Sequence, residues 1–265
     1  MTWQPLRPEL SRALADARRQ LHHAAQFATA FGISYLDPRD DDSHTNLEWL
    51  PEDGALASGP KRDARVALRV RDLTLIVNGH EFALHDQTIE RGAEWVRERL
   101  AEKGLPPDRY TLKRHFEIPA HPVGERQPFA AHAEKLEELS KWFGNAAELL
   151  AELAVTRGDA SEVRCWPHHF DMATVLSVAP GKTIGVGMEP GDEYYDEPYL
   201  YVKLHPAPAP EALLDAPSGG TWHKRDWIGA VLPGSRLPTE PVAQAAYAKE
   251  FIRSAVRTNE RLLAS

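Results

Sequence analysis

The spacing of apolar residues changes from helical to strand-like near Glu162, and this change constrains the fold more than any other feature of the chain. Before it, Leu10, Leu14 and similar residues recur every three or four positions, which is typical of helices packed along one side. After it, apolar and polar residues alternate, as in Leu200 and Val202, which is typical of half-buried strands. The spacing predicts helices at residues 8–31, 89–100, 129–155 and 241–263. It predicts strands at residues 66–77, 80–85, 110–118, 163–178, 183–188, 199–205 and 222–232.

These elements predict an α+β fold, with a mostly antiparallel sheet flanked by several amphipathic helices. Gly32 is expected to end the first helix, and Asn78-Gly79 is a hairpin signal because both residues tolerate positive φ. The segment 56–62 has the composition of a linker. It does not divide the chain clearly, so we expect a single domain over residues 1–265, with sub-blocks at 1–125 and 126–265.

Charge and cysteine content narrow the class of protein. The chain has a formal net charge of −8, which makes it a poor candidate for binding nucleic acid or an anionic membrane. No stretch approaches the ~18 apolar residues of a membrane span, and the first residues lack the apolar core of a signal peptide. Cys165 is the single cysteine and has no partner within the chain, which fits a reducing compartment. We therefore expect a cytoplasmic protein.

The segment Cys165-Trp-Pro-His-His-Phe-Asp171 holds the densest group of residues able to bind metal or transfer protons. On a strand, His169 and Asp171 share one face, and a bulge at Pro167 would turn His168 toward the same side. Imidazole and carboxylate groups that converge can hold a divalent metal or form an acid–base pair. In the structural alternative, His168 bonds backbone groups at the bulge and Asp171 accepts from neighbouring amides.

Two polar loops could add further side chains to this candidate metal or acid–base site. His44, in Ser43-His-Thr45, could deliver a ligand into a cleft, although an acidic surface loop explains the same residues. The connection that leads from residue 188 to 199 holds four carboxylates, at positions 192, 193, 196 and 197, and three tyrosines, more aromatic residues than a solvated loop needs. Among its carboxylates, we expect Glu197, at the start of a strand, to point inward.

Two more segments, one rich in glycine and one rich in tryptophan, are candidate parts of a binding site. Gly185 and Gly187 share a strand face and leave a bare backbone shelf, which Tyr201 and Lys203 would rim if the next strand pairs there. Simple packing of a ring over glycine is an equally good interpretation. In the segment 222–227, His223 lies between two tryptophans beside Arg225, so the segment either lines a pocket with an anion anchor or fills the core.

Common cofactor and nucleophile motifs are incomplete. Gly185-Val-Gly-Met-Glu-Pro190 has proline in place of the third glycine of a dinucleotide fingerprint. Strand character follows Gly181-Lys-Thr183, where a phosphate-binding loop requires a helix, so no nucleotide cofactor is expected. Cys165 and His168 would point to opposite faces of a strand, which favours a buried structural cysteine over a nucleophile.

Four stretches resemble a family of uncharacterised bacterial proteins, a domain of unknown function. They are Asp41-Asp-Ser-His-Thr-Asn-Leu-Glu-Trp49, Arg164-Cys-Trp-Pro-His-His-Phe-Asp171, Pro190-Gly-Asp-Glu-Tyr-Tyr-Asp-Glu-Pro-Tyr199 and Trp222-His223. The resemblance covers most of the chain and implies one integrated family fold. It implies no activity.

A metal-dependent enzyme, a hydrolase or isomerase acting on a small anionic substrate, is the first hypothesis. The expected ligands of Zn²⁺, Mn²⁺ or Fe²⁺ are His168, His169 and Asp171, joined by His44 or Glu197 from the flanking loops. The expected catalytic residues are His223, Glu197 and Arg225.

The second hypothesis is a non-catalytic protein that binds a small molecule in an aromatic-lined pocket. Its expected wall comprises six aromatic residues, Trp166, Tyr194, Tyr195, Tyr201, Trp222 and Trp227. Four of them, Trp166, Tyr195, Tyr201 and Trp222, would also hold the substrate of an enzyme. The third is an oligomeric subunit or scaffold whose aromatic patch is an interface.

Overall fold

The computed structural model describes residues 3–264 and has an α+β fold with two antiparallel sheets, of five and six strands. The chain forms two compact units. Unit 1 comprises residues 1–13, 141–163 and 171–265, and unit 2 comprises residues 14–140 and 164–170.

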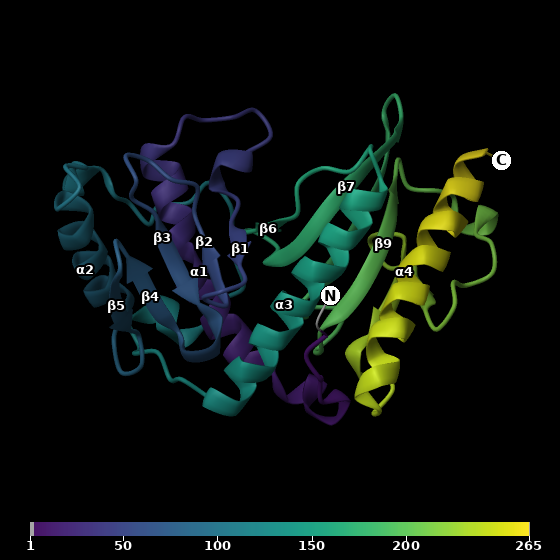
Figure 1. Cartoon of the computed structure of the whole chain (residues 1–265), viewed down its shortest axis with the longest axis horizontal. Helices are drawn as coiled ribbons and strands as arrows, with labels where there is room; N and C mark the ends of the chain where they lie inside the picture. Colours follow the sequence, from purple (N-terminus) through teal and green to yellow (C-terminus); the bar gives the residue numbers. More distant parts are fainter. Residues whose placement is uncertain (1–2, 265) are drawn as a thin grey trace. The chain divides into compact units, whose positions relative to one another are not determined.

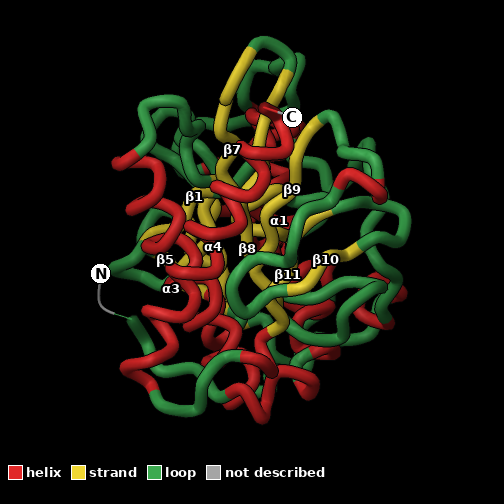
Figure 2. The backbone as a smooth tube through the Cα atoms, turned by 90° about the vertical axis from the view of Figure 1, so that its right-hand side faces the viewer, coloured by secondary structure: helices red, strands yellow, loops and turns green. Residues whose placement is uncertain are grey.

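Unit 1 is built on strands β7 to β11 and on two long helices (Figure 1). Its strands are β7 (Asp171–Ala179), β8 (Lys182–Glu189), β9 (Tyr199–His205), β10 (Thr221–His223) and β11 (Gly229–Pro233). Its helices are α4 (Pro241–Ala264) and the larger part of α3 (Ala133–Thr156). The strands follow the order β10-β11-β9-β8-β7, which Figure 2 shows from the side. Helix α4 contacts β8 and β9, and both helices lie along one face of the sheet (Figures 1 and 2).

The register of these strands determines which side chains share a face. Gly187 pairs with Tyr201, and Glu189 pairs with Tyr199. Because side chains alternate along a strand, these four residues lie on one face of the sheet. Buried apolar residues such as Val202 lie on the opposite face.

Unit 2 contains a five-stranded antiparallel meander with two helices against it (Figure 1). Its strands are β1 (Glu48–Leu50), β2 (Ala55–Ala57), β3 (Val66–Arg69), β4 (Thr74–Val77) and β5 (His80–Ala83), and it also holds β6 (Arg164–Trp166). Helix α1 (Ala15–Tyr35) contacts β2 and β3, and α2 (Ile89–Ala101) contacts β4 and β5. The Thr88 side chain caps α2 by accepting from the Arg91 amide at 3.3 Å.

Several predicted elements are confirmed. The Asn78-Gly79 hairpin has φ of 54° and 79° at its two residues, and β9 has the predicted bounds. Helices α2, α3 and α4 agree with their predicted ranges to within a few residues. In the part of the chain that the structure describes, no helix combines the length and apolar character needed to cross a bilayer.

Other predictions about secondary structure are wrong for physical reasons. Gly32 lies within α1 and does not end it; a Cβ there would lie 2.3 Å from the His44 carbonyl oxygen, so glycine lets the loop approach the helix. Residues 110–118 form no strand; the buried Tyr110 hydroxyl donates to the Phe27 carbonyl at 2.8 Å and anchors this irregular segment to α1. The predicted first helix begins with a separate 3₁₀ helix, Pro8–Ala13.

Three predicted strands differ from the structure in their continuity. A 3₁₀ turn at Val70–Asp72 interrupts the strand expected at 66–77, and the strand expected at 222–232 is the hairpin of β10 and β11. The third, expected at 163–178, is broken by a turn that includes two candidate histidines. Strand β2 (Ala55–Ala57) overlaps the first two residues of the predicted linker at 56–62.

Candidate functional site

Five aromatic side chains of unit 1 form a closed series of ring contacts, which we call the aromatic series. The centroid distances are 4.7 Å for Tyr195–Tyr199, 6.3 Å for Tyr199–Tyr201, 6.4 Å for Tyr201–Trp227, 4.2 Å for Trp227–His223 and 5.6 Å for His223–Tyr195. Tyr199, Tyr201 and His223 are buried, and the other two rings are partly exposed. Two of the predicted substrate-binding residues, Tyr195 and Tyr201, therefore lie in one cluster with the predicted catalytic His223.

Two glycines allow these rings to lie against the sheet. A Cβ on Gly187 would lie 2.6 Å from Cζ of Tyr201, and one on Gly229 would lie 2.6 Å from Cζ3 of Trp227. Any side chain at either position would displace the ring above it. The shelf predicted at Gly187 therefore exists, and Tyr201 covers it.

Asp192 organises the loop that supplies Tyr195. Its Oδ1 accepts from the amides of Tyr194 and Tyr195 at 2.7 and 2.8 Å, which is the local bonding typical of aspartate in tight turns. Its Oδ2 accepts from the Tyr199 hydroxyl at 2.7 Å. One carboxylate thus fixes both the loop and the first ring of β9.

The buried Tyr201 hydroxyl donates to Oδ2 of Asp171, at the start of β7. Burial, followed by the charge of Asp171, raises the pKa of Tyr201 well above its ordinary value, so the hydroxyl remains a donor. The other oxygen of this carboxylate, Oδ1, is also buried and has no hydrogen-bond partner among residues 3–264. Burying a carboxylate oxygen without a hydrogen-bond donor costs free energy, so Oδ1 of Asp171 is the chemically unusual atom of the site.

Both ring nitrogens of His223 are engaged. Its Nε2 lies 2.6 Å from the Arg225 carbonyl oxygen, and because a carbonyl only accepts, Nε2 carries a proton. Its Nδ1 lies 3.1 Å from the Tyr195 hydroxyl, which donates to it. These bonds position the ring, so general acid–base catalysis by His223 stays a prediction that would require one of them to open.

Arg225 and Trp222 lie beside the series but outside it. The exposed Arg225 guanidinium lies 4.8 Å from the Tyr194 ring, and Tyr194 in turn donates to Asp226 at 3.1 Å. Burial, and then the hydrogen bond to Asp226, raises the pKa of Tyr194 to about 12. Trp222 alternates with His223 on β10 and therefore points to the opposite face, where its indole donates to the Leu214 carbonyl at 2.8 Å.

Glu197 is buried, as predicted, and its contacts give it a structural role. Its two oxygens accept from the Ser235 amide at 2.6 Å and the Ser235 hydroxyl at 2.9 Å. Arg12 Nε approaches at 3.4 Å. The carboxylate thereby anchors the 3₁₀ turn Gly234–Arg236, and these contacts account for its burial without a catalytic role.

His168 and His169 lie in the turn between β6 and β7 and not on a strand. Phe170 has a φ of 68°, and its left-handed conformation ends the alternation from which the metal set was predicted. The two imidazole centroids are 4.3 Å apart, and the Trp166 ring lies 6.2 Å from that of His168. All three residues belong to unit 2, whereas Asp171 belongs to unit 1.

His44 lies in unit 2 within the short 3₁₀ turn Ser43–Thr45. Its Nδ1 accepts from the Arg39 amide at 3.2 Å. Among residues 3–264, no group of three or more histidine, cysteine, aspartate or glutamate side chains is placed to hold a metal ion. The metal ligands proposed from the sequence therefore stay a prediction without geometric support.

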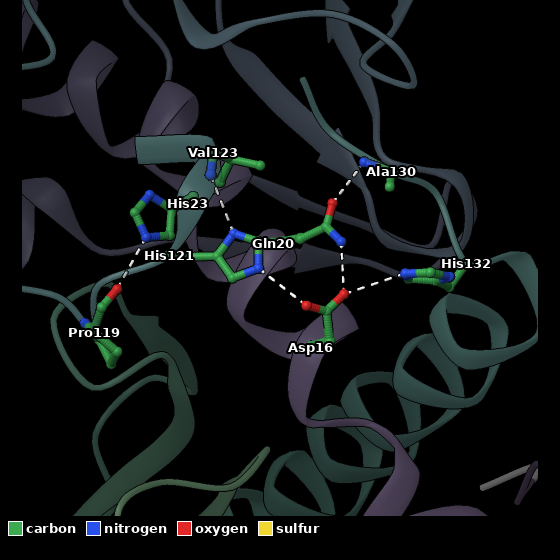
Figure 3. A network of polar contacts seen from close by, with 8 residues as sticks. All are labelled: Asp16, Gln20, His23, Pro119, His121, Val123, Ala130 and His132. Atoms are coloured by element: carbon green, nitrogen blue, oxygen red, sulfur yellow. Dashed lines mark hydrogen bonds and ion pairs between the residues drawn. The ribbon is translucent and has the colours of Figure 1, made fainter. Parts of the chain in front are cut away.

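A network of polar contacts surrounds Asp16 in unit 2, and no motif in the sequence indicates it (Figure 3). Asp16 bonds Nε2 of His121 at 3.1 Å and lies 3.2 Å from Nε2 of His132, while Gln20 donates to it at 2.8 Å. The Val123 amide donates to Nδ1 of His121, so Nε2 carries the proton that reaches Asp16. Burial would raise the pKa of Asp16, but hydrogen bonds from His121 and Gln20 outweigh it and lower the pKa.

His22 is buried on α1 and holds the turn that follows β6. Its Nε2 donates to the Pro167 carbonyl at 2.8 Å, and its ring stacks on Phe170 with centroids 4.8 Å apart. Burial is the largest cause that lowers the pKa of His22, to about 3. The turn is therefore supported by a neutral histidine.

Comparisons with protein-family models, with curated proteins and with solved structures gave no match. The resemblance to a bacterial family stays a prediction, and function must be argued from the geometry.

Proposed function

We propose that this protein binds a small organic molecule through the aromatic series of unit 1. The observation that supports the proposal most strongly is the closed sequence of five ring contacts. Aromatic side chains with polar groups fixed between them are typical of small-molecule sites. Ordinary core packing needs no buried carboxylate, yet Asp171 lies beside Tyr201 with one oxygen unbonded.

This proposal follows the second hypothesis from the sequence, that of a binding protein. A metal-dependent hydrolase or isomerase stays a prediction, and metal analysis of untagged protein tests it separately. Binding is favoured because the atoms best suited to catalysis, the ring nitrogens of His223, are both hydrogen-bonded.

A thermal-shift screen of small organic compounds, with substrate turnover monitored in parallel, tests the proposal. Compounds that stabilise the unaltered protein are tested again on Trp227→Phe and on Trp222→Phe. Trp222 is the matched control, because it lies on the opposite face of the same hairpin. We expect Trp227→Phe to reduce the shift and Trp222→Phe to leave it unchanged. Equal shifts in both variants, or no stabilising compound, would refute the proposal.

A further inference from the structure

Three carboxylates lie around the hydroxyl ends of the aromatic series. Asp171 accepts from Tyr201, and Asp192 accepts from Tyr199. Glu189 pairs with Tyr199 across β8 and β9, and its carboxylate is buried. The charges of Glu189 and Asp171 both act on the two hydroxyls and raise the pKa of each, after burial as the first cause. The surroundings of the Tyr199 and Tyr201 hydroxyls are therefore anionic.

The unbonded Oδ1 of Asp171 independently indicates that a ligand of the aromatic series carries a hydrogen-bond donor. Asp171 is 6% exposed, and this oxygen has no hydrogen-bond donor among residues 3–264. Buried charged oxygens in proteins nearly always meet a donor or a cation. Oδ2 of the same carboxylate bonds the Tyr201 hydroxyl, so Oδ1 belongs to a group already held against the series, and a ligand bound there is a candidate for the missing donor.

The faces of the rings favour the same charge. An aromatic face is electrostatically negative and attracts a cation within about 6 Å of its centroid. The ammonium of the exposed Lys203 already lies 5.6 Å from the centroid of the Tyr201 ring. A tethered ammonium in this position shows that the Tyr201 face accepts positive charge.

We propose that the ligand of the aromatic series is a protonated alkylamine, with its N–H donating to Oδ1 of Asp171 and its alkyl groups against the rings. This assignment rests on the proposed function and names its ligand class. The unbonded oxygen favours an ammonium that carries a hydrogen over a quaternary one. A metal ion is disfavoured, because no three ligand side chains are suitably placed among the described residues.

Three probes of similar shape separate the contribution of positive charge from that of a hydrogen-bond donor. Trimethylammonium is cationic and carries one N–H, tetramethylammonium is cationic without one, and tert-butanol is neutral with a donor. Their affinities are measured by calorimetry on the unaltered protein, on Asp171→Asn and on the exposed control Asp215→Asn. We expect trimethylammonium to bind about tenfold more tightly than tert-butanol, with tetramethylammonium between them. Asp171→Asn should remove the preference, and Asp215→Asn should retain it.

The outcomes distinguish the two proposals. If tert-butanol binds as tightly as trimethylammonium and Trp227→Phe weakens both, the amine assignment is wrong and the binding function stands. If no compound of the screen and none of the three probes binds, both proposals fail. Equal affinity for the two ammonium ions would refute the contact to Asp171. Because the probes are compared on the unaltered protein, the test does not depend on the folding of Asp171→Asn.

Discussion

Mild acid should weaken unit 2 through His22, the buried histidine that holds the turn after β6. Its pKa is about 3 in the folded protein, because burial disfavours the charged ring, and about 6.5 in the unfolded chain. Between these values the unfolded chain binds more protons than the folded one, so the free energy of unfolding falls as the pH falls from 6.5 toward 3. Each pKa unit corresponds to about 1.4 kcal/mol, so the complete loss would be about 5 kcal/mol.

The range from pH 7.5 to pH 5 leaves out most of the effect of carboxylates, whose ordinary pKa values lie near 4. Other histidines titrate in this range, and burial lowers the pKa of His23 as well, so the contribution of His22 is measured as the difference between the unaltered protein and a variant. Over this range, the linkage relation gives a loss of about 2 kcal/mol from His22. Urea unfolding curves at each pH, followed by circular dichroism, would measure it. The variant His22→Phe keeps a ring against Phe170, and Gln26 still donates to the Pro167 carbonyl at 3.2 Å.

We expect His22→Phe to lose about 2 kcal/mol less than the unaltered protein between the two pH values. His205→Gln, at an exposed histidine, is the matched control and should behave like the unaltered protein. Parallel curves for His22→Phe and the unaltered protein would show that His22 is not buried as a neutral ring, and the reasoning would be wrong.

Three further predictions concern single contacts, each measured by urea unfolding. Asp16→Asn should lower the free energy of unfolding at pH 7 by about 0.5–1 kcal/mol, because Asp16 is half exposed. That difference should vanish as the pH falls through the lowered pKa of Asp16, and a constant difference would contradict the network in Figure 3. Gly187→Ala should cost about 1–3 kcal/mol by displacing the Tyr201 ring, and an unchanged near-ultraviolet spectrum would refute this. Glu197→Gln should cost about 1–3 kcal/mol through its bonds to Ser235, without altering amine affinity; a loss of affinity would instead give it a role in binding.

Local patterns were sufficient to predict the strands and turns that depend on neighbouring residues. The alternation at 199–205 defines β9, and Asn78-Gly79 supplies the positive φ that its hairpin requires. The two glycines at 185 and 187 correctly indicated a face without side chains, and the predicted neighbours Tyr201 and Lys203 lie over it, with the Tyr201 ring packed on Gly187.

The turn at residues 167–170 could not be predicted, because its causes lie far away in the sequence. His22 and Gln26 of α1 hold the Pro167 carbonyl, and Phe170 adopts a left-handed conformation that a strand pattern does not reveal. The error then spread to the proposed metal ligands, since the shared face of His169 and Asp171 assumed an unbroken strand. The contact between Asp16 and His121 likewise joins residues 105 positions apart.

Binding of an amine at the aromatic series is tested most directly by the indole N–H resonances of the seven tryptophans. The Trp227 and Trp222 resonances are assigned with Trp227→Phe and Trp222→Phe, and trimethylammonium is then titrated into labelled, unaltered protein. We predict that the Trp227 resonance shifts and saturates while the Trp222 resonance, from the opposite face, stays in place. A Trp227 resonance that does not move while the protein binds trimethylammonium would contradict the site proposed here.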